Sequence, residues 1–183
     1  MEAITSLSTQ SGKGITLREL CVFAMLGALM FASKLIMEVL PNIHILGLLI
    51  VVYTIAFRAK ALIPIYIWIM LNGLLAGFAT WWIPYLYVWA VLWGMTMLLP
   101  KKMPKPVAVV VYTTVCTLHG LFFGVLYAPG EALLTGLDFN GMLAWIASGF
   151  VFDIMHAVGN FAAGLLIWPM SQLMLKLKRM YRL

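Results

Sequence analysis

The chain has 183 residues, of which 64% are hydrophobic and only 10% are charged. A soluble globular domain of this length could not bury so much apolar surface, so we expect most of the chain to lie in lipid. The net charge of +6 comes from short basic clusters between long apolar runs. This pattern indicates membrane topology rather than binding to nucleic acid.

Six apolar segments are candidates for membrane-spanning helices, each of which needs about 20 residues to cross the hydrocarbon core. They are residues 17–37, 43–57, 59–79, 82–99, 107–127 and 141–173. The second segment is short, and the sixth is long enough to tilt or to extend beyond the bilayer. We predict an all-α integral membrane protein with six transmembrane helices in one compact bundle.

The basic residues between these segments fall in alternate connections. The second connection contains Arg58 and Lys60, the fourth contains three lysines, and the chain ends in a basic tail, whereas the other connections contain none. The positive-inside rule therefore predicts that both termini are cytoplasmic. We expect a flexible cytoplasmic lead over residues 1–16, a membrane domain over 17–175 and a basic cytoplasmic tail over 176–183.

No signature of catalysis stands out in the sequence. Residues 11–14, Ser-Gly-Lys-Gly, are similar to part of a phosphate-binding loop, but Leu7 replaces the first glycine and Gly14 replaces the Ser or Thr that would follow the lysine. His-Glu-x-x-His and Gly-x-Ser-x-Gly motifs are also absent. We expect a protein that is not an enzyme and has no ATPase site of its own.

The first segment carries a stripe of small residues. Ala24, Ala28 and Ala32 recur at every fourth position, and Gly27 lies beside them. Small residues at this spacing allow another helix backbone to approach closely in lipid. The partner is either another helix of this chain or a separate membrane subunit, and spacing alone slightly favours the former.

The fourth segment carries a deep aromatic stripe. Trp82, Tyr85, Trp89 and Trp93 are spaced i, i+3, i+7 and i+11, so they share one helix face. At 1.5 Å per residue, Trp93 lies about 16 Å below Trp82, deeper than a belt at the lipid surface requires. The stripe either packs against protein or lipid, or forms an aromatic wall for a ligand.

The sixth segment places polar residues within the predicted membrane. Asp153, His156 and Asn160 share one face, and their natural partners are Asn72 on the third segment and His119 on the fifth. Polar residues at membrane depth must face a partner or a cavity. They form either a structural hydrogen-bond network or a ligand or ion site. The residue types would suit a metal, but the spacing does not, and we predict no metal site.

Lys34 and Glu38 lie one helical turn apart near the outer end of the first segment, where they could neutralise each other. Lys34 is the only fixed positive charge that we expect on the outer half. A polyanionic ligand would find little there to pair with.

Taken together, the six segments, the cytoplasmic termini, the Ala24–Ala28–Ala32 stripe and the aromatic outer half resemble the substrate-binding S component of an energy-coupling factor (ECF) transporter. The resemblance covers nearly the whole chain from Leu17 onward. It implies a multi-pass protein of the bacterial cell membrane that binds a vitamin from outside. Such a protein docks on a transmembrane coupling subunit, and two separate cytoplasmic ATPases hydrolyse the ATP, so this chain needs no cofactor.

The resemblance also implies roles for particular residues. Ala24, Ala28 and Ala32 become the docking face. The candidates for substrate binding are Trp82, Tyr85, Trp89, His119, Asp153, His156, Asn160, Lys34 and Asn72, with Asn42 and His44 in a possible gating loop.

The substrate is expected to be a vitamin and not a free metal ion. Cobalt- and nickel-specific relatives have a histidine directly after the first methionine, where this chain has Glu2. The chain is most similar to the cobalamin-specific type, and pantothenate, whose carboxylate could pair with Lys34, and a queuosine precursor are the next candidates.

Two alternatives from other functional classes remain open at this point. The chain could be a stand-alone transporter in which Asp153 and His156 relay protons, or a membrane assembly protein that binds no small molecule.

Overall fold

The computed structural model describes residues 14–40 and 42–183, and these residues form helices joined by short connections. The elements are α1 (Leu17–Ile36), α2 (Leu46–Phe57), the 3-10 turn η1 (Arg58–Ala61), α3 (Leu62–Ala76), α4 (Trp82–Leu98), α5 (Lys105–Leu121), α6 (Phe123–Thr135), α7 (Phe139–Gly164) and α8 (Ile167–Met180). The predicted all-α fold is confirmed for this part of the chain. Glu2, Leu7 and nearly all of the expected N-terminal lead lie outside the described residues.

Among the described residues, four helical stretches are long and apolar enough to cross a membrane. They are Leu17–Ile36, Leu46–Ala76, Lys105–Thr135 and Phe139–Gly164. The apolar helix α4, with 17 residues, is slightly shorter than the length of about 20 that a perpendicular crossing needs. By length and composition, the described helices are those of a membrane protein.

Residues 128–140, between the fifth and sixth predicted segments, were expected to be a connection, and this expectation is wrong as far as Thr135. After a break at Phe122, the chain continues as α6 to Thr135. The helix then ends at Gly136, whose φ of 75° is the left-handed conformation that glycine adopts without a steric cost. The apolar residues of α6 follow those of α5 without a breaker that would have marked the change of direction.

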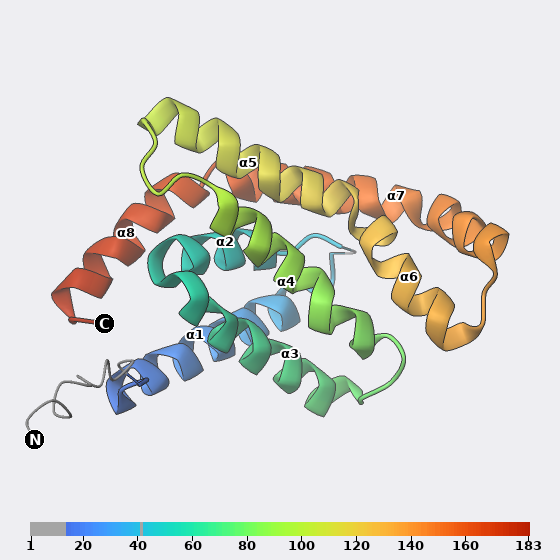
Figure 1. The fold of residues 1–183 in the computed structure, drawn as a ribbon, viewed down its shortest axis with the longest axis horizontal. Coiled ribbons are helices and arrows are strands. Elements are labelled where there is room, and N and C mark those ends of the chain that lie inside the picture. Colours follow the sequence, from blue (N-terminus) through green and yellow to red (C-terminus); the bar gives the residue numbers. More distant parts are fainter. Residues whose placement is uncertain (1–13, 41) are drawn as a thin grey trace, which may run out of the picture.

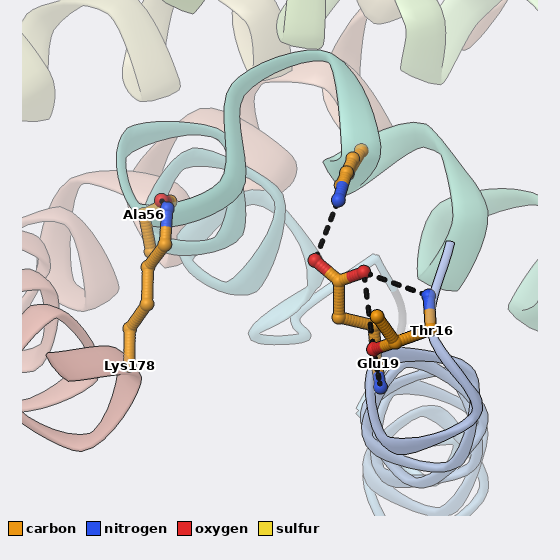
Figure 2. A network of polar contacts seen from close by, with 5 residues as sticks. Thr16, Glu19, Ala56 and Lys178 are labelled. Atoms are coloured by element: carbon orange, nitrogen blue, oxygen red, sulfur yellow. Dashed lines mark hydrogen bonds and ion pairs between the residues drawn. The ribbon is translucent and has the colours of Figure 1, made fainter. Parts of the chain in front are cut away.

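The sixth predicted segment, residues 141–173, was expected to be a single helix and is divided in two. Helix α7 ends at Gly164, and α8 starts at Ile167 in a new direction (Figure 1). The basic tail is therefore largely helical. Lys178 in α8 donates a hydrogen bond of 2.7 Å to the carbonyl oxygen of Ala56, at the end of α2 (Figure 2).

Local sequence explains where the main helices begin. Thr16 and Glu19 form a capping box at the start of α1, in which each side chain accepts a hydrogen bond from the backbone of the other residue. Asp138 caps α7 by accepting a hydrogen bond of 2.7 Å from the backbone nitrogen of Gly141. Helix α5 begins after Pro104, with a second proline in its first turn, where a missing N–H costs nothing.

The helices pack around α2, which is buried on nearly every side. Helices α5 and α7 run side by side, and α1 lies against α3 (Figure 1). Both contacts depend on glycine. A Cβ atom on Gly27 would lie 2.6 Å from the Ile67 side chain of α3, and one on Gly120 would lie 3.0 Å from the carbonyl oxygen of His156 in α7. The absence of a side chain at these two positions lets the backbones approach closely.

Basic residues from distant parts of the chain meet at one end of the molecule, which we call the basic end. Lys60 donates to Glu19, and Arg18 donates a hydrogen bond of 3.1 Å to the carbonyl oxygen of Tyr181. Arg58 donates to the carbonyl oxygen of Met97 at the end of α4. The start of α1 and the ends of α2, α4 and α8 therefore share this end.

Candidate functional site

A cavity of about 460 Å³ lies at the end of the molecule opposite the basic end. Its walls come from α4, α6, α7 and the connection that precedes α2. Aromatic rings form most of the lining, and two carboxylates complete it: Tyr85, Phe123, Tyr127, Trp145 and Phe152, with Glu131 and Asp153. We call this the outer cavity. It has the aromatic lining and few polar groups that are typical of small-molecule sites.

A second cavity, of about 100 Å³, adjoins the outer one and is called the inner cavity here. The two share Asn42, Tyr85 and Phe123 in their linings. The inner cavity adds three polar groups, Lys34, His44 and His156. Together the two cavities join an aromatic compartment to a smaller and more polar one.

Two other hollows of the molecule are less suited to a polar ligand. One, of about 660 Å³, is lined by residues of α3 alone, which makes it a groove on one helix face. A hollow of about 260 Å³ between α5 and α7 is lined mostly by valine, leucine and threonine side chains. Both are apolar surfaces of the kind that lipid covers.

The aromatic stripe of α4 faces the protein interior. Trp89 is 1% exposed, and its ring lies 5.2 Å from that of Trp68 and 5.3 Å from that of Phe123, measured between centroids. The indole N–H groups of Trp82 and Trp93 donate to carbonyl oxygens of neighbouring elements, at 2.9 and 3.1 Å. Within the stripe, Tyr85 lines both cavities, and the Trp89 ring packs against the rings of Tyr85 and Phe123.

The three histidines of the chain converge beneath the cavities. The rings of His44 and His156 are 4.7 Å apart, and His119 lies 5.6 Å from Trp89 and 6.0 Å from Phe123. One nitrogen of His119 is 3.0 Å from the carbonyl oxygen of Val88, but each of the three rings keeps one buried nitrogen without a partner. The sequence placed His44 only in a possible gating loop.

His44 lies between α1 and α2, and its surroundings oppose a positive charge. Burial, together with the positive charge of Lys34, lowers the pKa of His44 to about 4. The ring is therefore neutral at pH 7. Within the described residues, no group of three or more His, Cys, Asp or Glu side chains could hold a metal ion.

Asp153 is the most exceptional polar group of the outer cavity. It is 4% exposed, and its Oδ1 accepts a hydrogen bond of 3.0 Å from the backbone nitrogen of Gly124. Its Oδ2 has no hydrogen-bond partner. A Cβ atom on Gly124 would lie only 2.5 Å from Oδ2, so the carboxylate occupies the space that glycine leaves free. Unpartnered buried polar atoms are rare in proteins and often mark functional sites.

Asn160 lies on the same face of α7 as Asp153 but in different surroundings. Its amide nitrogen donates a hydrogen bond of 3.0 Å to the carbonyl oxygen of Cys116, in the close contact between α5 and α7. Asn160 is fully buried and lines neither cavity. Asn72, on α3, also lines neither cavity, and α3 packs mainly on α1 and α4.

The connection that precedes α2 covers the inner cavity. Asn42 has a φ of 55°, an unusual backbone conformation for a residue other than glycine, and its side chain donates to the carbonyl oxygen of Phe152 at 3.4 Å. Lys34 lies 3.9 Å from Glu38, a pair too long and too exposed to contribute much stability.

The alanine stripe of α1 lies on the outer surface. Ala24, Ala28 and Ala32 are exposed, whereas Gly27, which lies beside this stripe, faces α3. In this chain, internal packing of α1 therefore depends on Gly27 and leaves the three alanines uncovered.

Several lining residues were not identified from the sequence. The rings of Tyr127 and Trp145 stack at 5.7 Å with an angle of 6° between them. Trp145 and Phe152 share a helical spacing on α7 with the predicted Asp153, so periodicity could have found them. Phe123, Tyr127 and Glu131 could not be placed, because all three lie on α6, a separate helix that the sequence analysis did not predict.

No family model, no curated protein and no solved structure matches this chain.

Proposed function

We propose that the chain is the substrate-binding membrane subunit of an ECF-type importer for a vitamin or a related small molecule. In this proposal it crosses the bacterial cell membrane six times with both termini in the cytoplasm. It binds its substrate from outside and docks on a transmembrane coupling subunit that is driven by two separate ATPases.

One observation carries the proposal: a ligand-sized aromatic cavity with a buried, unpartnered carboxylate oxygen lies opposite the basic end. Because basic residues favour the cytoplasmic side, the cavity would open outward. Substrate entry from outside requires this orientation. The exposed alanine face of α1 lies on a different part of the molecule and supports docking on a partner.

The size of the cavity bears on the substrate. A volume of about 460 Å³ lies within the range of roughly 300–1,000 Å³ that holds drug-sized ligands. Cobalamin, which the sequence favours, is larger than such ligands and would require the connection before α2 to move aside. Pantothenate and a queuosine precursor are small enough for the cavity as it stands.

A ligand screen on the purified chain in detergent tests the proposal. Tryptophan fluorescence is a direct readout, because Trp145 lines the outer cavity and Trp89 touches two of its lining residues. The panel is cobalamin, pantothenate, riboflavin, thiamine, biotin, folate and a queuosine precursor. Saturable binding of one compound, with a matching rise in melting temperature, is expected. If folded protein showed no change in fluorescence or melting temperature with any compound of the panel, the proposal would be contradicted.

A proton-coupled transporter is the second candidate, because Asp153 and His156 both line the cavities and both keep an unpartnered polar atom. The isolated chain in liposomes would then accumulate substrate under an imposed pH gradient. An S component would bind substrate but accumulate it only together with its ATPases, so the same experiment separates the two functions.

A further inference from the structure

Resting on the proposed function, we infer that the site selects ligands that carry an N–H donor and no carboxylate, and that Oδ2 of Asp153 accepts the hydrogen bond from that donor. The inference assigns a chemical class to the substrate and a specificity-determining role to one residue.

The geometry around Asp153 leaves one of its two carboxylate oxygens without a hydrogen-bond partner. Oδ1 is held by the backbone nitrogen of Gly124, and Oδ2 is buried without a partner beside the outer cavity. A buried acceptor in this state has lost its hydration without a compensating bond, which costs free energy in the unliganded protein. A ligand with an N–H group restores that bond on binding, whereas a second carboxylate cannot.

The distribution of charge points in the same direction. The outer cavity is lined by two acidic residues, Glu131 and Asp153, and by no Lys or Arg among its lining residues. In an apolar enclosure, like charges repel more strongly than they do in water. Lys34 lines the adjoining inner cavity and already faces Glu38 at 3.9 Å.

The remaining walls favour a flat ligand. Tyr127 and Trp145 present stacked rings, and the Tyr85 ring meets that of Tyr127 edge to face at 6.2 Å. Aromatic faces carry partial negative charge and favour flat or cationic partners. A nitrogen heterocycle with a ring amine or an alkyl ammonium group fits both the aromatic walls and the free acceptor.

The test divides a defined panel by chemistry. Cobalamin, riboflavin, thiamine and the aminomethyl-deazaguanine precursor of queuosine carry N–H donors and no carboxylate, whereas pantothenate, biotin and folate carry a carboxylate. Binding to the wild-type chain is measured by fluorescence and by calorimetry. We expect the bound compound to come from the first group. Saturable binding of pantothenate, biotin or folate would overturn the inference while leaving the proposed function intact.

The variant Asp153→Asn then tests the residue with the bound compound. Loss of the charged acceptor should weaken binding about 10- to 100-fold, the range for hydrogen bonds to charged groups. Asp138→Asn is the matched control: it makes the same chemical change at an exposed helix cap outside both cavities, and asparagine is an equally good cap. An unchanged dissociation constant in folded Asp153→Asn would overturn the role of Asp153.

The panel on the wild-type chain keeps the inference testable even where Asp153→Asn does not fold. Absence of binding by every compound contradicts the proposed function itself. Binding by a carboxylate-bearing compound contradicts only the inference.

Discussion

Asp153 and Asn160 lie on one face of α7, seven residues apart, and each keeps one buried side-chain oxygen without a hydrogen-bond partner, but only Asp153 lines a cavity. Around Asn160, the glycines of neighbouring helices let the backbones close on the side chain: a Cβ atom on Gly47 would lie 2.9 Å from its Oδ1, and one on Gly120 would lie 2.7 Å from its Nδ2. Around Asp153, aromatic rings hold the helices apart and leave a cavity of about 460 Å³. The two residues have equivalent positions along the helix, so the groups packed opposite each one decide whether it serves packing or can contact a ligand.

The largest effect is expected outside both regions, on the exposed face of α1. Ala28→Trp should abolish transport by the complete importer, because a bulky ring prevents close approach of a partner helix. Binding and melting temperature of the isolated chain should stay unchanged, because Ala28 is exposed and touches neither region. Ala28→Gly is the control, since it keeps the face small. Normal transport by Ala28→Trp would show that the alanine face does not dock.

Trp89→Ala should reduce the free energy of unfolding by about 3–5 kcal/mol, the usual cost of removing a buried aromatic side chain. Trp89 is 1% exposed and contacts Trp68, Tyr85 and Phe123. We therefore interpret Trp89, like Asn160, as a packing residue. Denaturant or thermal unfolding in detergent measures the loss of stability. If the variant were as stable as the wild type but bound ligand poorly, Trp89 would belong to the site.

Two alanine substitutions four residues apart test the comparison directly. Gly120→Ala brings a Cβ atom within 3.0 Å of the His156 carbonyl oxygen, and because this backbone atom cannot move freely, we expect a loss of about 1–3 kcal/mol in stability. In Gly124→Ala, the atoms nearest to the new Cβ belong to the Asp153 carboxylate, the end of a side chain that can shift more easily than a backbone atom. This substitution should leave stability nearly unchanged and weaken ligand binding.

Melting temperatures and dissociation constants of the two variants, measured side by side, check this pair. The comparison fails if Gly124→Ala destabilises the protein as much as Gly120→Ala, because Asp153 would then be packed as tightly as Asn160.

The sequence was sufficient for the helical fold and for part of the site, for physical reasons that differ between residues. Apolar runs and alternating basic connections mark helices well, since the bilayer imposes both length and charge. Tyr85, Asp153 and His156 were found because polar or aromatic residues at membrane depth are exceptional. Asn160 is equally exceptional in the sequence, but it lies in a close helix contact. Its sequence neighbours do not reveal this contact, because the glycines that create it belong to other helices.

The turn at Phe122 shows what the sequence could not supply. Helix α6 follows α5 without a break in the apolar pattern, so the direction of Tyr127 and Glu131 depends on packing against α4 and α7. At the second break, Leu165 and Leu166 themselves favour a helix, and the local signals are Gly164 before them and Pro169 after them. The direction that the chain takes after each break depends on contacts between distant segments.

The smallest expected effect concerns the outermost wall of the cavity. Trp145→Ala removes one ring of the stacked pair with Tyr127, and we expect it to weaken binding of a flat ligand by about 0.5–1.5 kcal/mol, the usual contribution of an aromatic pair. Phe150→Ala is the matched control, because Phe150 lies on the same helix, is 48% exposed and lines neither cavity. Calorimetry with the compound from the ligand screen measures both variants. Equal losses of affinity in the two variants would mean that α7 as a whole, and not its aromatic wall, determines affinity. A loss confined to Trp145→Ala would show that the ligand contacts Trp145 as well as Asp153.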